Sequence, residues 1–174
     1  MKNRALRSWC LGLSLPALAM PGAAVATPVL GEHAAACATG TQAPAALVTV
    51  TGFKDRKGKV RIQVYSDHPD EFLAKGHKLM RVDVPTTPAG DMTICVPLPG
   101  KLPRYSLVVL HDRDNDGRMD GTSDGFAFSN NPKLGWSKPH VDRVAFNAPQ
   151  GVASMRITLN YLQGLSIRPI KSAE

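Results

Sequence analysis

The chain has 174 residues, 43% of them hydrophobic and 20% charged, with 15 Gly, 14 Pro and 3 Cys. This composition is typical of one globular domain and excludes collagen-like and largely disordered chains. Taking the three basic residues of the first 26 positions from the 21 Lys and Arg leaves 18 against 14 Asp and Glu, a net charge of +4. We expect no nucleic-acid partner, because proteins that bind nucleic acids carry a much more basic surface.

Residues 1–26 have the pattern of a secretory signal peptide. Lys2, Arg4 and Arg7 precede an apolar run over 9–20, and small residues at 24–26 suit a cleavage site. The run has 12 residues, whereas a membrane-spanning helix needs about 20. We therefore expect a periplasmic or secreted protein that does not insert into the membrane once its leader is removed.

Two cysteines remain in the exported chain, since Cys10 leaves with the leader. Cys37 and Cys95 form an even pair in an oxidising compartment, which predicts a disulfide that closes a loop of nearly sixty residues. Two free buried thiols are the alternative. Residues 27–46 are rich in Ala, Thr, Pro and Gly and show no period, so they are predicted to form an extended arm held at Cys37.

Alternation of apolar and polar residues, with many β-branched side chains, predicts seven strands after the arm. They span 47–51, 59–65, 78–84, 91–96, 105–111, 141–146 and 152–162. In the second strand Val60, Ile62 and Val64 share one face and should lie in the core. The last segment alternates without a break and predicts one full-length strand.

A turn over 55–58 separates the first two strands and is surrounded by basic residues. These are Lys54, Arg56, Lys57, Lys59 and Arg61. Because hairpin tips are normally charged and exposed, the cluster is interpreted as a solvated tip, with a polyanion-binding patch as the alternative.

One short helix is predicted over 69–75, between the second and third strands. Pro69 stands early, Asp70 and Glu71 occupy the first turn, and Gly76 follows the end. Seven short strands with one connecting helix predict an all-β fold, an antiparallel two-sheet sandwich of the immunoglobulin-like or transthyretin-like class. The sandwich domain is placed at 47–163, with a C-terminal tail at 164–174.

The strand 105–111 leads into an acidic loop with the spacing of a calcium-binding loop. Counted from its first residue, acids stand at positions 1, 3, 5 and 9 and glycine at position 6: Asp112, Asp114, Asp116, Asp120 and Gly117. Alternate side chains of a tightly curled loop converge on one point, and the carbonyl oxygen of Arg118 can join them. Hard oxygen ligands favour calcium.

The loop is not an EF-hand, because it follows a strand and has Ser123 at position 12 where an EF-hand has a bidentate Glu. Asp124, one residue later, is a candidate substitute. Without the bidentate acid the affinity is expected in the range of about 10⁻⁴ to 10⁻³ M found in extracellular modules. The alternative is an acidic turn that stays in water.

The segment after the acidic loop places three aromatic residues beside two asparagines. These are Phe126, Phe128 and Trp136 with Asn130 and Asn131. Exposed aromatics beside an ion can bind a sugar or a small apolar molecule. The alternative is that the rings pack beneath a long loop while the asparagines cap a turn.

The sequence has no H-E-x-x-H and no P-loop, so these two catalytic motifs are missing. The histidines are scattered, and His111 at a strand end is typical of a structural residue. A metal-assisted hydrolase built on Asp112 and Asp120 stays a third hypothesis.

The sequence resembles the secreted bacterial domain-of-unknown-function family 2141 over roughly 47–161. The resemblance rests on His111-Asp112, the Asp114, Asp116-Gly117 and Asp120 spacing, 125–132, Gly135, Pro139, 144–146 and 72–76. Family members usually have Asn at the positions of Asp114 and Asp116, so this chain is more favourable to a cation. The resemblance implies an exported β-sandwich and supplies no activity.

These observations together predict an exported, non-catalytic module of the cell envelope that binds one calcium ion. Its partner would be an unknown envelope or extracellular component. The alternative is a small-molecule or carbohydrate-binding protein that uses the aromatic segment beside the ion.

Overall fold

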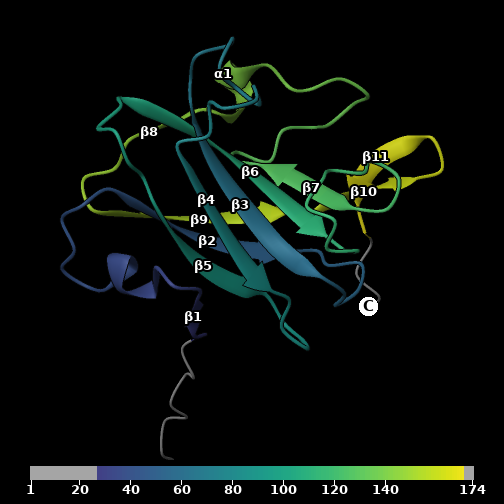
Figure 1. The fold of residues 1–174 in the computed structure, drawn as a ribbon, viewed down its shortest axis with the longest axis horizontal. Helices are drawn as coiled ribbons and strands as arrows, with labels where there is room; N and C mark the ends of the chain where they lie inside the picture. Colours follow the sequence, from purple (N-terminus) through teal and green to yellow (C-terminus); the bar gives the residue numbers. More distant parts are fainter. Residues whose placement is uncertain (1–26, 171–174) are drawn as a thin grey trace, which may run out of the picture.

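The structure is a computed structural model that describes residues 27–170, so the predicted signal peptide lies outside the described residues. These residues form eleven strands, one α-helix and one 3-10 helix (Figure 1). The strands are β1 (Val29–Leu30), β2 (Ala45–Thr51), β3 (Lys59–Ser66), β4 (Met80–Pro85), β5 (Met92–Pro97), β6 (Arg104–Asp112), β7 (Gly125–Phe128), β8 (Phe146–Asn147), β9 (Val152–Thr158), β10 (Asn160–Gln163) and β11 (Ser166–Pro169). The helices are η1 (Ala34–Cys37) and α1 (Val141–Val144).

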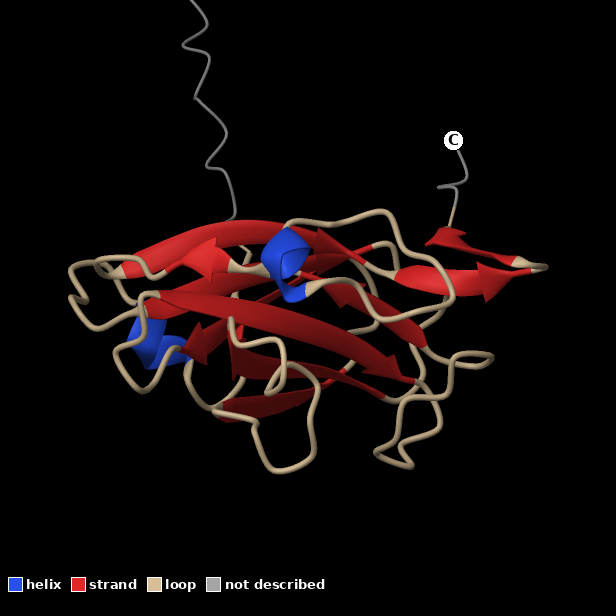
Figure 2. Ribbon diagram, turned by 90° about the horizontal axis from the view of Figure 1, so that it is seen from above, coloured by secondary structure: helices blue, strands red, loops and turns tan. Residues whose placement is uncertain are grey.

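The strands lie in two sheets that pack as layers (Figure 2). One sheet has the order β1-β5-β2-β9, and the other has the order β11-β10-β7-β6-β3-β4 with β8 paired to β6. The predicted antiparallel arrangement holds for most strand pairs but is wrong for two, because β1 pairs with β5, and β2 with β9, in parallel. Only a tight hairpin forces neighbours to be antiparallel, and long stretches of chain separate both of these pairs.

The core between the sheets consists of the side chains that alternation assigned to the inside. Val60, Ile62 and Val64 of β3 are fully buried, as predicted. From the opposite sheet they meet Val48 and Val50 of β2 and Met92, Ile94 and Val96 of β5. The first five predicted strands are therefore confirmed as β2 to β6, with shifts of one or two residues at their ends.

Two local predictions are wrong. The predicted helix at 69–75 is a set of turns, because the positive φ of Leu73 (63°) interrupts helical geometry just after the bond from Phe72 N to His68 O. The predicted strand at 141–146 is instead α1 followed by β8. Val141 and Val144 lie three residues apart, so one helical turn buries both on the same side.

The predicted single strand at 152–162 is also wrong, since it divides at Leu159 into β9 and β10. β9 belongs to the smaller sheet and β10 to the larger one. Ile157, Leu159 and Tyr161 nevertheless all point into the core. The alternation of apolar and polar residues continues across Leu159 because β9 and β10 both face the same core.

Both ends of the described chain are held by more contacts than the sequence suggested. The predicted disulfide between Cys37 and Cys95 is confirmed. β1 pairs with β5, and the segment predicted as a tail contributes β11, which pairs with β10. Within residues 27–170, none of the helices is long and apolar enough to cross a membrane.

A second apolar cluster covers the outer face of the larger sheet. Its buried members are Tyr65, Phe72, Val108, Phe126, Phe128, Val141 and Val144. Phe126 and Phe128 come from β7, a strand within the segment that the sequence suggested as a loop. The outer face is thus apolar around β7 and polar near the end of β6, where the acidic loop begins.

Candidate metal centre

Asp112, the last residue of β6, is the buried anchor of the acidic loop. Its side chain is 0% exposed, and its cross-strand neighbour on β3 is Lys59. The Lys59 Nζ lies 3.0 Å from Asp112 Oδ2, and Arg61 Nη2 lies 3.7 Å from the same oxygen. Gly117 N also donates to Oδ2 at 3.1 Å. Oδ1 is buried and has no hydrogen-bond partner among the described residues.

Asp114 and Asp116 approach this buried carboxylate from the curled loop. One carboxylate oxygen from each of the three aspartates lies within 4.8 Å of the others. Asp114 Oδ1 accepts a bond from Asp116 N at 3.1 Å, and Asp116 Oδ1 accepts one from Arg118 N at 2.7 Å. The positive φ of Gly117 (79°) supplies the sharp turn that this spacing requires.

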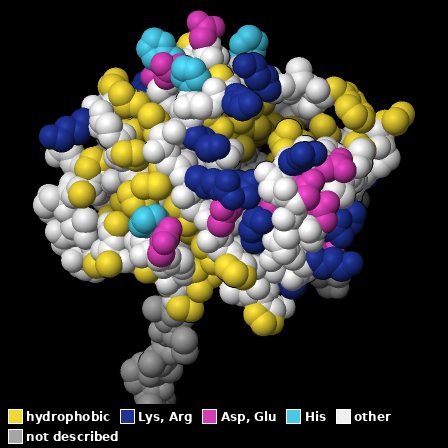
Figure 3. Space-filling view, viewed as in Figure 1, with side chains coloured by type: hydrophobic (Ala, Val, Ile, Leu, Met, Phe, Trp, Pro, Cys, Tyr) yellow, Lys and Arg dark blue, Asp and Glu magenta, His cyan; other side chains and the backbone are white. Residues whose placement is uncertain are grey.

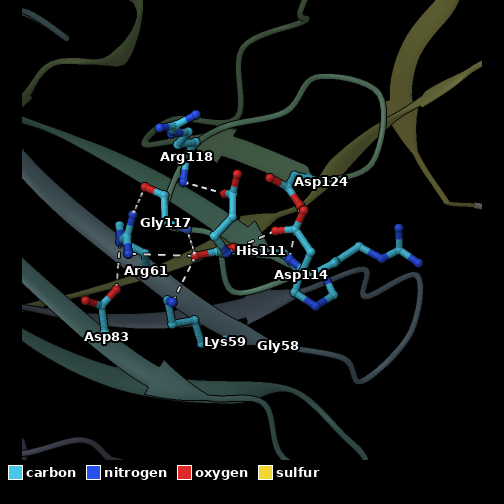
Figure 4. A network of polar contacts seen from close by, with 12 residues as sticks. Gly58, Lys59, Arg61, Asp83, His111, Asp114, Gly117, Arg118 and Asp124 are labelled. Atoms are coloured by element: carbon cyan, nitrogen blue, oxygen red, sulfur yellow. Dashed lines mark hydrogen bonds and ion pairs between the residues drawn. The ribbon is translucent and has the colours of Figure 1, made fainter.

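Arg61 fixes the loop above the sheet. Its Nη1 donates to Gly117 O at 2.6 Å, and its Nε donates to Asp83 Oδ1 at 2.7 Å. Figure 4 marks both contacts with dashed lines. The side chain is only 4% exposed, so the interpretation of the basic cluster as a solvated tip is wrong for Arg61. The acidic loop folds back over β3 and covers it, which alternation within β3 could not reveal.

Asp124 organises the second half of the loop. It is 1% exposed, and its two carboxylate oxygens accept bonds from Arg113 N and Asp120 N, both at 3.0 Å. Asp124 N in turn donates to Asp120 O at 2.9 Å. Asp124 therefore joins the two ends of the loop, and it is not part of the three-aspartate group.

Asp120, predicted as a fourth ligand, also lies outside that group. Its Oδ1 accepts bonds from Thr122 Oγ1 at 2.7 Å and Thr122 N at 2.8 Å, and these bonds lower the pKa of Asp120. The structure thus brings together Asp112, Asp114 and Asp116. Asp120 and the carbonyl of Arg118 as ligands stay predictions.

Replacing Asp124 by asparagine is expected to destabilise the protein by about 1–3 kcal/mol, because an amide has one acceptor oxygen, so the buried side chain can serve only one of the two N–H groups. The free energy of unfolding in denaturant measures this loss. Asp142→Asn is a matched control, since the Asp142 side chain is 82% exposed. Equal stabilities of the two variants would contradict the assigned role of Asp124.

An ion pair ties the β2–β3 turn to the start of the loop. Arg113 Nε donates to Asp55 Oδ2 at 3.0 Å, and Arg113 Nη1 donates to Ser123 O at 2.6 Å. The hydrogen bonds from the Arg113 guanidinium lower the pKa of Asp55 to about 2. Arg113 is therefore committed to Asp55 and to the loop backbone, away from the three aspartates.

His111 has a structural role beneath the loop. Its Nε2 faces Lys57 O at 2.8 Å, so it carries the proton, and Nδ1 accepts from the hydroxyl of Tyr161 at 2.7 Å. Burial lowers the pKa of His111, and it raises the pKa of Tyr161 to about 12. A neutral imidazole with both nitrogens bonded supports the end of β6.

The five residues suggested for ligand binding divide into two groups. Phe126, Phe128 and Trp136 line one pocket of about 260 Å³, in which Trp136 is 73% exposed. Asn130 instead donates to Ala145 O at 3.0 Å, and Asn131 to Arg156 O at 2.8 Å. The two asparagines thus tie the end of β7 to distant backbone, Asn130 to the residue after α1 and Asn131 to β9, and neither of them lines this pocket.

The model of the family DUF2141, described as an uncharacterized protein conserved in bacteria, matches residues 48–156. The matched range contains the whole acidic loop and most of both sheets, and it confirms the resemblance noted in the sequence. No curated protein and no solved structure matches the chain.

Proposed function

Since the chain belongs to the bacterial family DUF2141, whose description assigns no activity, we propose a function from the loop itself. The protein is an exported, non-catalytic module of the cell envelope that binds one calcium ion at Asp112, Asp114 and Asp116. The signal-like leader and the disulfide support an oxidising compartment outside the cytoplasm. The sandwich class, immunoglobulin-like or transthyretin-like, is part of the same proposal.

The observation that carries this proposal is Oδ1 of Asp112, which is buried and has no hydrogen-bond partner within residues 27–170, on a carboxylate grouped with two others. Leaving a buried polar atom unpaired costs about 1–3 kcal/mol, and more for a charged group. A cation bound by that oxygen removes the cost and the repulsion among the three acids. Calcium takes six to eight oxygen ligands, so the Arg118 carbonyl, Asp120 and water would complete its shell.

Two cations next to Asp112 set the expected strength of binding. Lys59 and Arg61 already offset part of its charge through Oδ2, so the loop offers less net negative charge than its acid count suggests. Calcium affinity in such loops follows ligand charge and rigidity. An affinity of about 10⁻⁴ to 10⁻³ M fits this balance.

Calcium at 10 mM is expected to raise the melting temperature of the mature protein by roughly 3–10 °C. The reason is that an ion with this affinity, bound only by the folded protein, stabilises the folded state. Asp114→Ala should weaken binding by roughly tenfold or more, and Asp114→Asn by less, because an amide oxygen can still ligate. Isothermal titration calorimetry measures both affinities. Asp70→Asn, a change at an exposed acid outside the loop, should leave the affinity unchanged.

Asp114 is exposed, so both substitutions leave the core intact and a folding failure would not obscure the result. Identical melting temperatures in calcium and in chelator, for wild type and variants alike, would contradict the calcium site.

A second candidate function, binding of a small molecule beside the ion, is favoured by one specific observation. Three of the residues suggested for it, Phe126, Phe128 and Trp136, line a single pocket.

A further inference from the structure

The pocket beside the acidic loop opens where the second apolar cluster meets solvent. Figure 3 shows hydrophobic side chains in a hollow on the upper right of this face, with Lys and Arg side chains next to it. The apolar lining comes mainly from Leu73, Phe126, Leu134, Trp136, Leu162 and Ile167. The volume of about 260 Å³ lies just below the range of roughly 300–1,000 Å³ typical of drug-sized ligands. The hollow therefore suits a small molecule with an apolar body.

The charged side chains that line the hollow and its neighbours are all basic. Lys138 is a lining residue, and two adjoining hollows that share Leu134 and Gly135 add Lys133, Arg143 and Arg168. No Asp or Glu lines any of these three hollows in the described part of the chain. A sugar would need a dense set of hydrogen-bonding partners, which this lining does not offer. The basic border instead complements an anionic group.

The acidic loop forms one wall of the same pocket. Met119, Gly121 and Thr122 all line it. Thr122 is bonded to Asp120, and Asp120 is bonded to Asp124. The wall thus belongs to the same short loop as the three aspartates, and an ion that orders the loop also positions the wall.

We propose that this pocket binds a small amphipathic anion, an apolar body carrying one acidic group, and that calcium in the acidic loop strengthens this binding. The inference rests on the proposed calcium site and adds the ligand class and the coupling. Calcium acts in two ways: it fixes the Met119–Thr122 wall, and it neutralises carboxylates that would repel the anion. By thermodynamic linkage the anion must strengthen calcium binding by the same factor.

Two fluorescent dyes that differ by one acidic group test the proposal. Anilinonaphthalene sulfonate is the anionic dye, and N-phenylnaphthylamine is its neutral counterpart. We expect the anionic dye to bind the mature protein, with an affinity at least about fivefold higher in saturating calcium than in chelator. Calcium should raise the affinity of the neutral dye by a smaller factor, because this dye benefits only from the ordered Met119–Thr122 wall. Trp136, the only tryptophan outside the leader, gives a second readout.

Variants locate the binding site. Gly121→Leu adds a large apolar side chain at a lining position with open space around the Cβ, so it should change the affinity for the dye without a clash. Trp136→Ala removes an exposed lining ring at little cost to folding, and Lys138→Gln should reduce the preference for the anionic dye. Leu79→Ala is the control for loss of an exposed apolar side chain outside these hollows.

The outcomes separate this inference from the calcium site. Calcium binding without dye binding, dye affinity unaffected by calcium, or dye binding unchanged in Gly121→Leu and Trp136→Ala would each overturn the inference alone. Dye binding at the pocket in a protein that shows no calcium binding would overturn the proposed function and the coupling together.

Discussion

Replacing Gly58 by alanine should lower the free energy of unfolding by at least about 3 kcal/mol. A Cβ at this position would lie 1.9 Å from the carbonyl oxygen of Asp112 and 2.9 Å from the backbone of Arg113. Because the contacts are backbone atoms at the start of the acidic loop, no side-chain rotation can relieve them. The φ of +70° adds further strain for any residue with a Cβ.

Gly76→Ala separates the two sources of this effect. Its φ is +88°, yet an added Cβ would meet nothing within 4 Å. The free energy of unfolding of this control should fall by only about 1–2 kcal/mol, the cost of placing an alanine at a positive φ. Chemical denaturation of both variants measures the difference, and equal losses would show that the close approach of Gly58 to Asp112 does not matter. Calcium affinity should fall in Gly58→Ala alone, since Asp112 must move.

Loss of the disulfide is the second large effect. The bond joins Cys37 of η1 to Cys95 of β5 across a sequence separation of 58 residues. In the chain-entropy model, cross-links over loops of this length stabilise by about 4 kcal/mol, mainly by restricting the unfolded chain. The double variant Cys37→Ala, Cys95→Ala is therefore expected to unfold at much lower denaturant concentration than the wild type.

A reducing agent provides the internal control for the disulfide. It should destabilise the wild type to about the level of the double variant and leave the variant itself unchanged. A loss below about 1 kcal/mol would contradict this account, because it would mean that β1 and η1 are held to β5 by packing alone.

The sequence predicted the central strands well, because their signal is local. Val60, Ile62 and Val64 alternate with polar residues in β3, and burial of one face follows directly from that pattern. The acidic loop was also predictable, since its aspartates and Gly117 stand at fixed spacings within a few residues. The structure gathers three of the four predicted aspartates into one group.

Other features depend on contacts between distant segments, and no local pattern encodes them. Arg61 follows the alternation of β3, but its burial depends on the loop around Gly117 folding back over the sheet. The division of 152–162 at Leu159 depends on which sheet offers a free strand edge. The sequence indicates Asp124 only as a substitute ligand, because no residue near it in the sequence shows that both of its carboxylate oxygens accept backbone N–H groups.

The two wrong predictions, a helix at 69–75 and a strand at 141–146, have the same cause. Short apolar runs satisfy a helical turn and a strand equally well. Phe72, Val141 and Val144 are buried together on the outer face of the larger sheet. Their conformation was therefore decided by packing onto Phe128 and its neighbours and not by local propensity.

The most direct test of the central claim is a crystal structure of the mature protein grown in millimolar calcium. We expect one ion bound to Oδ1 of Asp112 and to Asp114 and Asp116, at the calcium–oxygen distances of about 2.3–2.6 Å found in proteins. A well-ordered loop with no ion, and with Asp112 Oδ1 still unpartnered or bonded only to water, would contradict it.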